Sequence, residues 1–205
     1  MLRFAKRLFC FLFTGLAFSA CALAQIKLPD IFSDHMVLQR GMPIPVWGVA
    51  GGGASLKLSL GGYLATARAG QSGNWRATLP SMQAGGPFEL TIASEGQTIR
   101  LTDVYIGEVW LCSGQSNMEW PLEKCASGPE EIPQAGNPLL RFFQMKKKHP
   151  LNDTPFSDSQ LAAFSKGEFF HPAKWERCTP ETAAPFSGVA YFFGKALQDS
   201  LKMAV

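Results

Sequence analysis

Hydrophobic and polar residues alternate strictly in two stretches of the chain, at positions 56–60 and 88–92. Such alternation predicts strands with one face packed on a core and the other face in water, which is typical of antiparallel sheets. Glycine-containing turn segments punctuate this region at residues 51–53, 61–62, 72–74 and 85–87. Several short strands separated by turns predict that residues 25–103 form an all-β unit, a small β-sandwich or jelly roll.

The pattern changes near Asp103, where alternation gives way to continuous apolar sequence. Residues 104–112 are apolar almost throughout, interrupted only by Gly107 and Glu108. A run of this kind predicts a strand buried on both faces, as in a parallel sheet. Residues 139–145 are a second candidate strand, and the stretch between the two is polar and rich in Pro and Gly. We therefore expect a second unit, of α/β type, over residues 104–205.

A helical period marks the carboxyl-terminal part of the chain. Apolar residues recur there at i, i+3, i+4, i+7 and i+8, namely Val189, Phe192, Phe193, Ala196, Leu197 and Leu201. Ser187 is placed to cap this helix, with Pro185 just outside it. In an α/β unit a further strand should follow directly. Because the sequence stops at Val205, we expect the second unit to be incomplete.

The first 24 residues have the pattern of a secretory signal peptide. A basic start precedes an apolar run over residues 8–16, and residues 22–24 (Ala-Leu-Ala) supply the small side chains of a cleavage site. We expect export to the periplasm or the cell exterior. A membrane anchor is the first alternative, but the run is short and Ser19 interrupts it. A lipid anchor on Cys21 is the second.

Amino-terminal sequencing of exported material is expected to begin at Gln25, because cleavage after Ala24 fits the small-residue rule. A start at a lipid-bearing Cys21 would establish the lipoprotein form instead. An intact amino terminus on exported material would contradict both.

Cleavage also changes the charge of the chain. The full sequence has 19 Lys and Arg against 16 Asp and Glu, a formal net charge of +3. The leader holds three of these basic residues and no acidic one, so the mature chain is neutral. This excludes the basic footprint of a nucleic-acid-binding protein, and the basic run at residues 146–148 is expected to be a solvated loop.

Three cysteines remain in the mature chain: Cys112, Cys125 and Cys178. Their spacing matches no zinc pattern. Cys112 lies in the apolar run and is expected in the core. Export permits one disulfide, for which Cys125 with Cys178 is the favoured pair, and the sequence leaves the disulfide state open.

The segment around Ser116 carries the candidate chemistry. An apolar strand is expected to end there, and Gly114 permits a tight turn that exposes the hydroxyl and aims backbone N–H groups at the space before it, as acyl transfer requires. A nucleophilic Ser also needs a His as base and an acid to orient that His. Met118 stands where the α/β-hydrolase motif has its second Gly, so that motif is not supported. From these residues alone, an inert strand-ending loop remains the alternative.

Six segments resemble, in order, the sialate O-acetylesterase family of SGNH-type hydrolases. Residues 114–120 (GQSNMEW) resemble the block around the nucleophile of that family. The other segments are residues 34–40, 45–48, 73–75, 103–110 and 186–193. The resemblance implies a β-sandwich followed by the start of an SGNH-hydrolase domain.

The resemblance also implies an activity: hydrolysis of acetyl esters on sialic acid or similar glycans through an acyl-enzyme, with no metal or cofactor. It makes Ser116 the nucleophile and its backbone N–H an oxyanion donor. Gln115 and Asn117 flank this Ser and are candidates for binding substrate or for bracing the turn. The family's base, in an Asp-x-x-His motif, and its Gly and Asn oxyanion donors belong to later blocks, which residues 1–205 lack. We therefore expect this chain by itself to be nearly inactive.

The sequence offers three histidines, and none is indicated as the base. His35 lies within the segment 34–40 and is expected to be structural, while His149 lies in the loop after the basic run. Glu168 and His171 imitate the Asp-x-x-His spacing, but they precede the predicted helix rather than follow a sheet. A base has to reach the Ser by a hydrogen bond, and nothing in the sequence places His171 so close.

Two other functions stay open. An acetyl-xylan type esterase is not separable from a sialate esterase by sequence. A non-catalytic glycan-binding protein would use the β-sandwich, with Trp47 and Trp75 as candidate stacking surfaces; burial of the two indoles is the competing interpretation.

Overall fold

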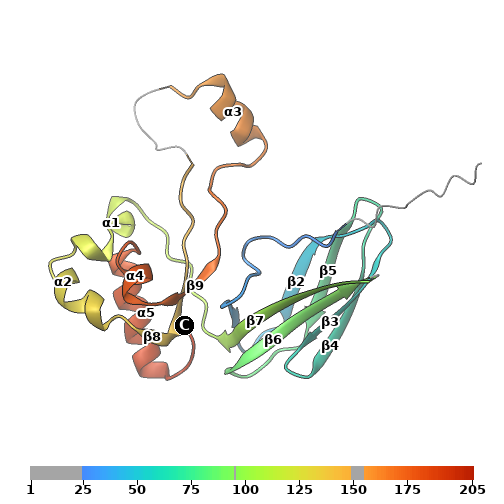
Figure 1. Ribbon diagram of the computed structural model, residues 1–205, viewed down its shortest axis with the longest axis horizontal. Helices are drawn as coiled ribbons and strands as arrows, with labels where there is room; N and C mark the ends of the chain where they lie inside the picture. Colours follow the sequence, from blue (N-terminus) through green and yellow to red (C-terminus); the bar gives the residue numbers. More distant parts are fainter. Residues whose placement is uncertain (1–24, 95, 149–154) are drawn as a thin grey trace, which may run out of the picture.

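The computed structural model describes residues 25–94, 96–148 and 155–205. The expected signal peptide, Cys21 and His149 lie outside the described residues. Most strands gather on one side of the molecule, the helices and a small second sheet lie on the other, and an arm that carries α3 (Asp158–Ser165) projects between them (Figure 1). Within the described ranges, no helix is both long and apolar enough to cross a membrane.

A mixed five-stranded sheet forms most of the β-rich side, in the order β1-β7-β6-β3-β4. Its strands are β1 (Val37–Gln39), β7 (Gln97–Gly107), β6 (Gly85–Ser94), β3 (Ser55–Leu60) and β4 (Tyr63–Arg68). β1 and β7 run parallel, with Val37 opposite Tyr105, and the other neighbours are antiparallel. β2 (Ile44–Val49) and β5 (Asn74–Leu79) form a separate antiparallel pair.

The two alternating stretches are confirmed as strands β3 and β6. The side chains of Leu56, Leu58 and Leu60 are buried, as are those of Leu90 and Ile92. They share one apolar core with inward residues of β2 and β5. Full burial of one such side chain contributes about 2 kcal/mol, so this core fixes the register of both strand sets.

The strand predicted over residues 104–112 is wrong beyond Gly107. Val104 and Ile106 are fully buried in β7, but the chain then leaves the sheet. Leu111 is 93% exposed, and Cys112 is exposed rather than in the core. An apolar run forms a buried strand only where neighbouring strands cover it, and no strand among the described residues pairs with residues 109–112.

The predicted boundary near Asp103 falls inside β7, which continues to Gly107. The division of the chain into a 25–103 unit and a 104–205 unit therefore stays a prediction. In the structure, β7 is the last strand of the mixed sheet along the chain, and the residues after Gly107 lead directly to the helical side.

The helical side is built around a two-stranded antiparallel sheet. β8 (Asn137–Phe143) covers most of the second predicted strand and pairs with β9 (Trp175–Cys178). The helices beside it are α1 (Ser116–Glu119), η1 (Leu122–Lys124), α2 (Gly128–Glu131), η2 (Ile132–Gln134), α4 (Pro180–Ala183) and α5 (Gly188–Leu201). A second core, with Leu122, Leu140, Phe142, Tyr191 and Val205, holds these elements together.

The helix predicted from the 3.6-residue period is confirmed as α5. The Ser187 hydroxyl accepts a hydrogen bond from the Ala190 N–H at 3.3 Å, which is the predicted cap. Beyond α5, the Val205 N–H donates to the Leu139 carbonyl, and the Arg141 N–H donates to the Val205 carbonyl, each at 2.9 Å. This is the hydrogen-bond pattern of a parallel pairing beside β8.

Candidate active site

Ser116 is the first residue of α1, a single helical turn between β7 and the helical side. The turn is closed by the Gln115 carbonyl, which accepts hydrogen bonds from the Met118 N–H at 2.9 Å and the Glu119 N–H at 3.3 Å. The Ser116 side chain is exposed. The hydroxyl is therefore displayed at the surface, where an ester could reach it.

The start of α5 holds the Ser116 turn in place. The Ser187 hydroxyl donates a hydrogen bond to the Met118 sulfur at 3.4 Å. The Gly188 N–H donates to the Trp120 carbonyl at 2.9 Å. A Cβ on Gly188 would lie 2.5 Å from the Cys125 sulfur, so this close approach requires glycine. The segments 114–120 and 186–193 thus lie side by side.

The pairing of β1 with β7 fixes where the chain leaves the sheet towards Ser116. The Val109 N–H donates to Gln39 Oε1 at 2.8 Å, just beyond the end of β7. Arg40 Nε donates to Glu108 Oε1 at 2.6 Å, and this hydrogen bond holds the pKa of Glu108 below its usual value. Segments 34–40 and 103–110 are far apart in sequence but form one structural unit, from which the chain runs to Ser116.

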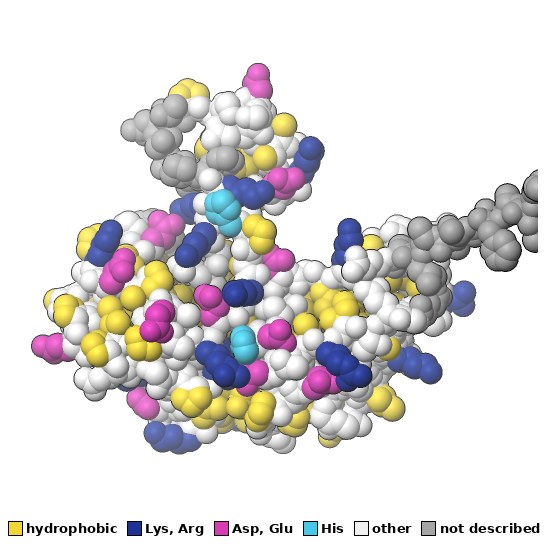
Figure 2. Space-filling view, in the orientation of Figure 1, with side chains coloured by type: hydrophobic (Ala, Val, Ile, Leu, Met, Phe, Trp, Pro, Cys, Tyr) yellow, Lys and Arg dark blue, Asp and Glu magenta, His cyan; other side chains and the backbone are white. Residues whose placement is uncertain are grey.

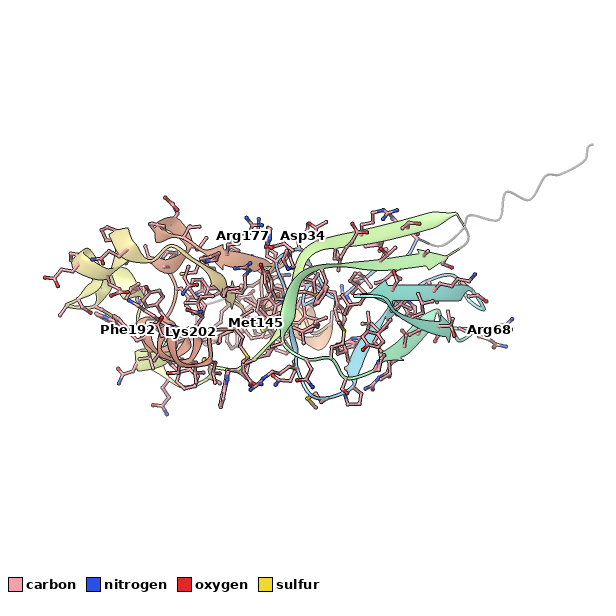
Figure 3. The ribbon with its side chains drawn as sticks, turned by 90° about the horizontal axis from the view of Figure 1, so that it is seen from below. Asp34, Arg68, Met145, Arg177, Phe192 and Lys202 are labelled. Atoms are coloured by element: carbon pink, nitrogen blue, oxygen red, sulfur yellow. The ribbon has the colours of Figure 1, made fainter. Side chains whose placement is uncertain are left out.

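Asp103 joins the β-rich side to the helical side. Its Oδ2 lies 2.7 Å from His35 Nδ1, 2.8 Å from Arg177 Nε and 3.2 Å from Arg141 Nη2. The Arg141 side chain is 1% exposed, and its guanidinium lies over the Tyr105 ring, 5.1 Å from the centroid. This Asp103 cluster (His35, Asp103, Arg141 and Arg177) brings together the β1 entry, β7, β8 and β9. Figure 3 shows Arg177 and Asp34 at this junction, and Figure 2 shows charged side chains of both signs gathered across it.

The charge state of Asp103 follows from these contacts. Burial raises the pKa of its carboxyl, but the hydrogen bonds from His35 and Arg177, together with the charge of Arg141, outweigh burial and lower it. The carboxylate is therefore ionised and balances the buried Arg141. His35 is engaged by Asp103, which agrees with its expected structural role.

The two neighbours of Ser116 do not brace its turn. Gln115 and Asn117 are exposed, and neither side chain makes a hydrogen bond within the part of the chain that the structure describes. The carbonyl of Gln115, not its amide group, closes the turn. Their side chains are free to face a ligand, and their role in binding substrate stays a prediction.

No histidine among residues 25–94, 96–148 and 155–205 forms a hydrogen bond with Ser116. His171 lies in the arm, where the Glu168 carboxylate pairs with Lys148 at 3.1 Å rather than with His171. Among the described residues, Ser116 therefore remains a candidate nucleophile, and no histidine forms a hydrogen bond with it. The sequence reasoning missed one contact here: Lys147 Nζ lies 2.6 Å from Glu119 Oε1 and ties the arm to α1.

The three cysteines that the structure describes, Cys112, Cys125 and Cys178, form no disulfide. The Cys178 thiol donates to the Ala135 carbonyl at 2.7 Å, and burial raises the pKa of that thiol to about 11. The Cys125 thiol faces the Pro121 carbonyl at 3.6 Å. The favoured Cys125–Cys178 disulfide is therefore not formed, since the two thiols face different carbonyl groups.

Comparison with known proteins shows which proteins this chain resembles. No protein-family model matches the chain. The chain is 29% identical over 194 residues to the sialate O-acetylesterase of Rattus norvegicus, and 26% identical over 199 residues to that of Homo sapiens. Each similarity covers 87% of the chain. The chain is a homologue of the sialate O-acetylesterases.

A solved structure agrees with this relationship. The crystal structure of a carbohydrate acetylesterase from Xanthomonas citri superposes with a TM-score of 0.74 at 35% sequence identity, over 87% of this chain and 38% of that one. The chain spans about a third of the length of the sialate O-acetylesterases it matches, 34% of the rat protein and 35% of the human one. The fold therefore resembles the corresponding part of a carbohydrate acetylesterase.

Proposed function

We propose that this chain contributes Ser116 as the nucleophile of a carbohydrate O-acetylesterase, which removes acetyl groups from sialic acid or similar glycans. The observation that carries the proposal is the similarity to sialate O-acetylesterases over 87% of the chain. The exposed Ser116 hydroxyl also supports the proposal. This hydroxyl stands on a turn that Gly188 holds on one side and the β1–β7 pair holds on the other.

In the proposed reaction, Ser116 Oγ attacks the acetyl carbonyl and gives its proton to a base, and the sugar hydroxyl leaves with a proton. Water then hydrolyses the acetyl-enzyme to acetate and restores the Ser116 hydroxyl. The Ser116 N–H, at the start of α1, is proposed to stabilise the oxyanion. The base and further oxyanion donors are proposed to come from blocks that follow residue 205 in a longer protein.

The finer description of the fold belongs to the same proposal. We take residues 25–103 as a jelly-roll-like sandwich, supported by the single core that the mixed sheet shares with the β2–β5 pair. We take residues 104–205 as the start of an SGNH-type α/β domain, supported by the parallel pairing of Val205 beside β8. Export, by cleavage after Ala24 or with a lipid on Cys21, is likewise proposed.

The glycan-binding alternative is weakened by the position of one tryptophan. Trp75 is buried in the shared core and offers no stacking surface. Trp47 is 42% exposed and packs edge-to-face on Phe32, with ring centroids 4.7 Å apart. An acetyl-xylan type esterase remains the alternative within the same reaction class.

Acetate release tests the proposal directly. We expect a longer protein that carries the family's later blocks after residue 205 to release acetate from O-acetylated sialic acid or from acetylated xylan. The 205-residue chain should stay at the background rate, because no base reaches Ser116 within its described residues. Equal rates for the two proteins would make Glu168 and His171 the pair to examine. No release from any acetylated glycan by the longer protein would favour the binding alternative.

A further inference from the structure

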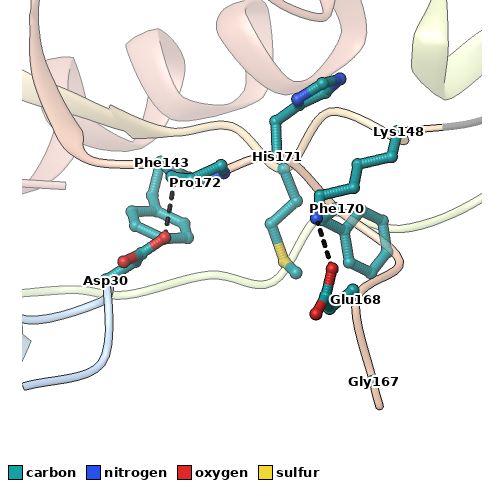
Figure 4. Close-up of a pocket in the computed structure, with 10 residues that line it drawn as sticks. Asp30, Phe143, Lys148, Gly167, Glu168, Phe170, His171 and Pro172 are labelled. Carbon is teal, nitrogen blue, oxygen red and sulfur yellow. Dashed lines mark hydrogen bonds and ion pairs between the residues drawn. The ribbon is translucent and has the colours of Figure 1, made fainter. Parts of the chain in front are cut away.

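A cavity of about 340 Å³ opens at the base of the arm, whose described residues are 144–148 and 155–174 (Figure 4). The two limbs of the arm are held together there, since Lys147 and Phe170 form a β-bridge and the Lys148 N–H donates to the Phe169 carbonyl at 3.0 Å. A third wall comes from the loop before β1, where Asp30 Oδ2 accepts a hydrogen bond from the Ala173 N–H at 2.8 Å. Hydrogen bonds among three segments therefore build this cavity.

The cavity has an apolar floor. Phe143, Met145 and Phe170 line it, and Phe143 is itself supported by the Trp175 ring, with centroids 5.6 Å apart. Met145 is 55% exposed and Phe170 is 40% exposed, so apolar surface faces solvent at a concave site. Pockets of this size, with an apolar lining and a few polar groups, are the usual form of small-ligand sites. The negative face of an aromatic ring attracts the C–H groups of a sugar ring.

Carboxylates stand on opposite sides of this floor. Asp30 lies on one side and Glu168 on the other (Figure 4). Carboxylate oxygens accept hydrogen bonds and donate none, so they suit a ligand that offers hydroxyl donors. Lys148 pairs with Glu168 at 3.1 Å and cancels its charge, which leaves the Asp30 charge in excess. The imidazole of His171 points away from both carboxylates (Figure 4). The sum of the three charges of Asp30, Glu168 and Lys148 is negative, so the cavity favours a neutral sugar over an anionic one.

The cavity is connected to the nucleophile helix through adjacent residues of the arm. Lys148 lines the cavity, while the side chain of the preceding Lys147 pairs with Glu119 in α1, the helix that Ser116 begins. The arm that forms the cavity is thus tied to the helix that begins at Ser116.

From these observations we propose that the base of the arm is a binding site for a neutral pyranose unit of the glycan. The assignment to a glycan rests on the proposed function. It deepens that function, because it predicts that the glycan bound in the cavity is a neutral polysaccharide rather than a sialylated one.

Binding, not hydrolysis, tests the site. Xylobiose and N-acetylneuraminic acid are titrated into the ¹⁵N-labelled chain at pH 8, and amide shifts give both dissociation constants. We expect xylobiose to bind at least about tenfold more tightly than the acidic sugar. Phe170→Ala should weaken xylobiose binding about tenfold, because it removes the ring from the floor. Asp30→Asn should bring the dissociation constants of the two sugars closer together, because it removes the excess negative charge. The variant keeps a side-chain oxygen that can accept the hydrogen bond from the Ala173 N–H.

Leu161→Ala is the matched control, since Leu161 is an apolar arm residue that is 52% exposed and does not line the cavity. It should leave both dissociation constants unchanged, and circular dichroism should show that all variants keep the fold. The proposal is overturned if N-acetylneuraminic acid binds as tightly as xylobiose, or if Phe170→Ala and Leu161→Ala act alike. Since acetate release is not measured, this failure would leave the proposed role of Ser116 intact.

Discussion

Replacing Ser116 with Ala is expected to lower acetate release by a longer protein with the family's later blocks by about 10⁴–10⁶-fold, the range found when a triad member is removed from a serine protease. The loss should appear in kcat, because the hydroxyl forms the bond that the transition state requires. The turn itself should survive, since the Gln115 carbonyl and the Gly188 N–H hold it without help from the Ser116 side chain. A fluorophosphonate probe should label the parent protein at Ser116 and leave the variant unlabelled.

Ser113→Ala supplies the control for this experiment. Ser113 is exposed in the same connection between β7 and α1, three residues before the proposed nucleophile. Its hydroxyl has no assigned role, so the variant should retain the parent rate and the probe label. Retained turnover in Ser116→Ala, or equal loss in both variants, would remove Ser116 from the mechanism.

Replacing Asp103 with Asn is expected to destabilise the fold by about 3 kcal/mol, because loss of one partner leaves the charge of a buried ion pair uncompensated. The stranded group is Arg141, whose side chain is 1% exposed and whose Nε has no hydrogen-bond partner among the described residues. Asn keeps the shape of Asp and tolerates the left-handed backbone at this position, where φ is +56°. Urea unfolding, followed by circular dichroism, measures the change.

The matched control is Glu89→Gln on the solvent face of β6. Glu89 pairs with Arg100 at 2.8 Å, but both side chains are exposed. Ion pairs in water contribute little, so this variant should unfold at nearly the parent urea concentration. If the two variants lose equal stability, the Asp103 cluster does not join the two sides of the molecule as described.

The same cluster predicts a direction for the pH dependence. Burial raises the pKa of Asp103, but its hydrogen bonds and the neighbouring Arg charges lower that pKa by a larger amount. The pKa of Asp103 in the folded state therefore lies below its value in the unfolded state. A lowered folded pKa gives stability that is present above the unfolded pKa, about 3.9, and is lost as pH falls through the folded value. The urea concentration at the unfolding midpoint should therefore decrease in the parent chain as the pH is lowered below about 4. The Asp103→Asn variant should show a smaller decrease.

The parts of the fold that the sequence predicts correctly are those set by local periodicity. Leu56, Leu58 and Leu60 alternate because one face of β3 meets the core, and this pattern needs no knowledge of the partner strand. The α5 helix was likewise indicated by its spacing and by Ser187, whose capping bond is local. In each case neighbours in sequence are neighbours in space.

The errors concern residues whose surroundings come from distant segments. The apolar run over residues 104–112 is compatible with a buried strand, but the run itself does not show whether other strands pack on it. Leu111, within this run, is in fact exposed. The Asp103 cluster joins residues from four segments, and no periodicity links His35 with Arg177. The one local signal was the presence of Asp103 and His35 in the two family-like segments. For Ser116, the turn could be predicted, but the tie between Lys147 and Glu119 could not.

The parallel pairing of β1 with β7 sets an order for folding of the nascent chain. His35 and Asp103 are 68 residues apart, so the loop between them must close before β1 gains a partner, at an entropic cost that a short hairpin does not meet. The β3–β4 hairpin turns at Gly61 and Gly62 and forms from residues made almost together. Met36 and Val37 leave the ribosome early, but they gain their neighbouring strand only when β7 has been synthesised. Within the five-stranded sheet, the β1–β7 edge that steadies the Ser116 segment is therefore expected to form last, which ties maturation of the site to completion of the sheet.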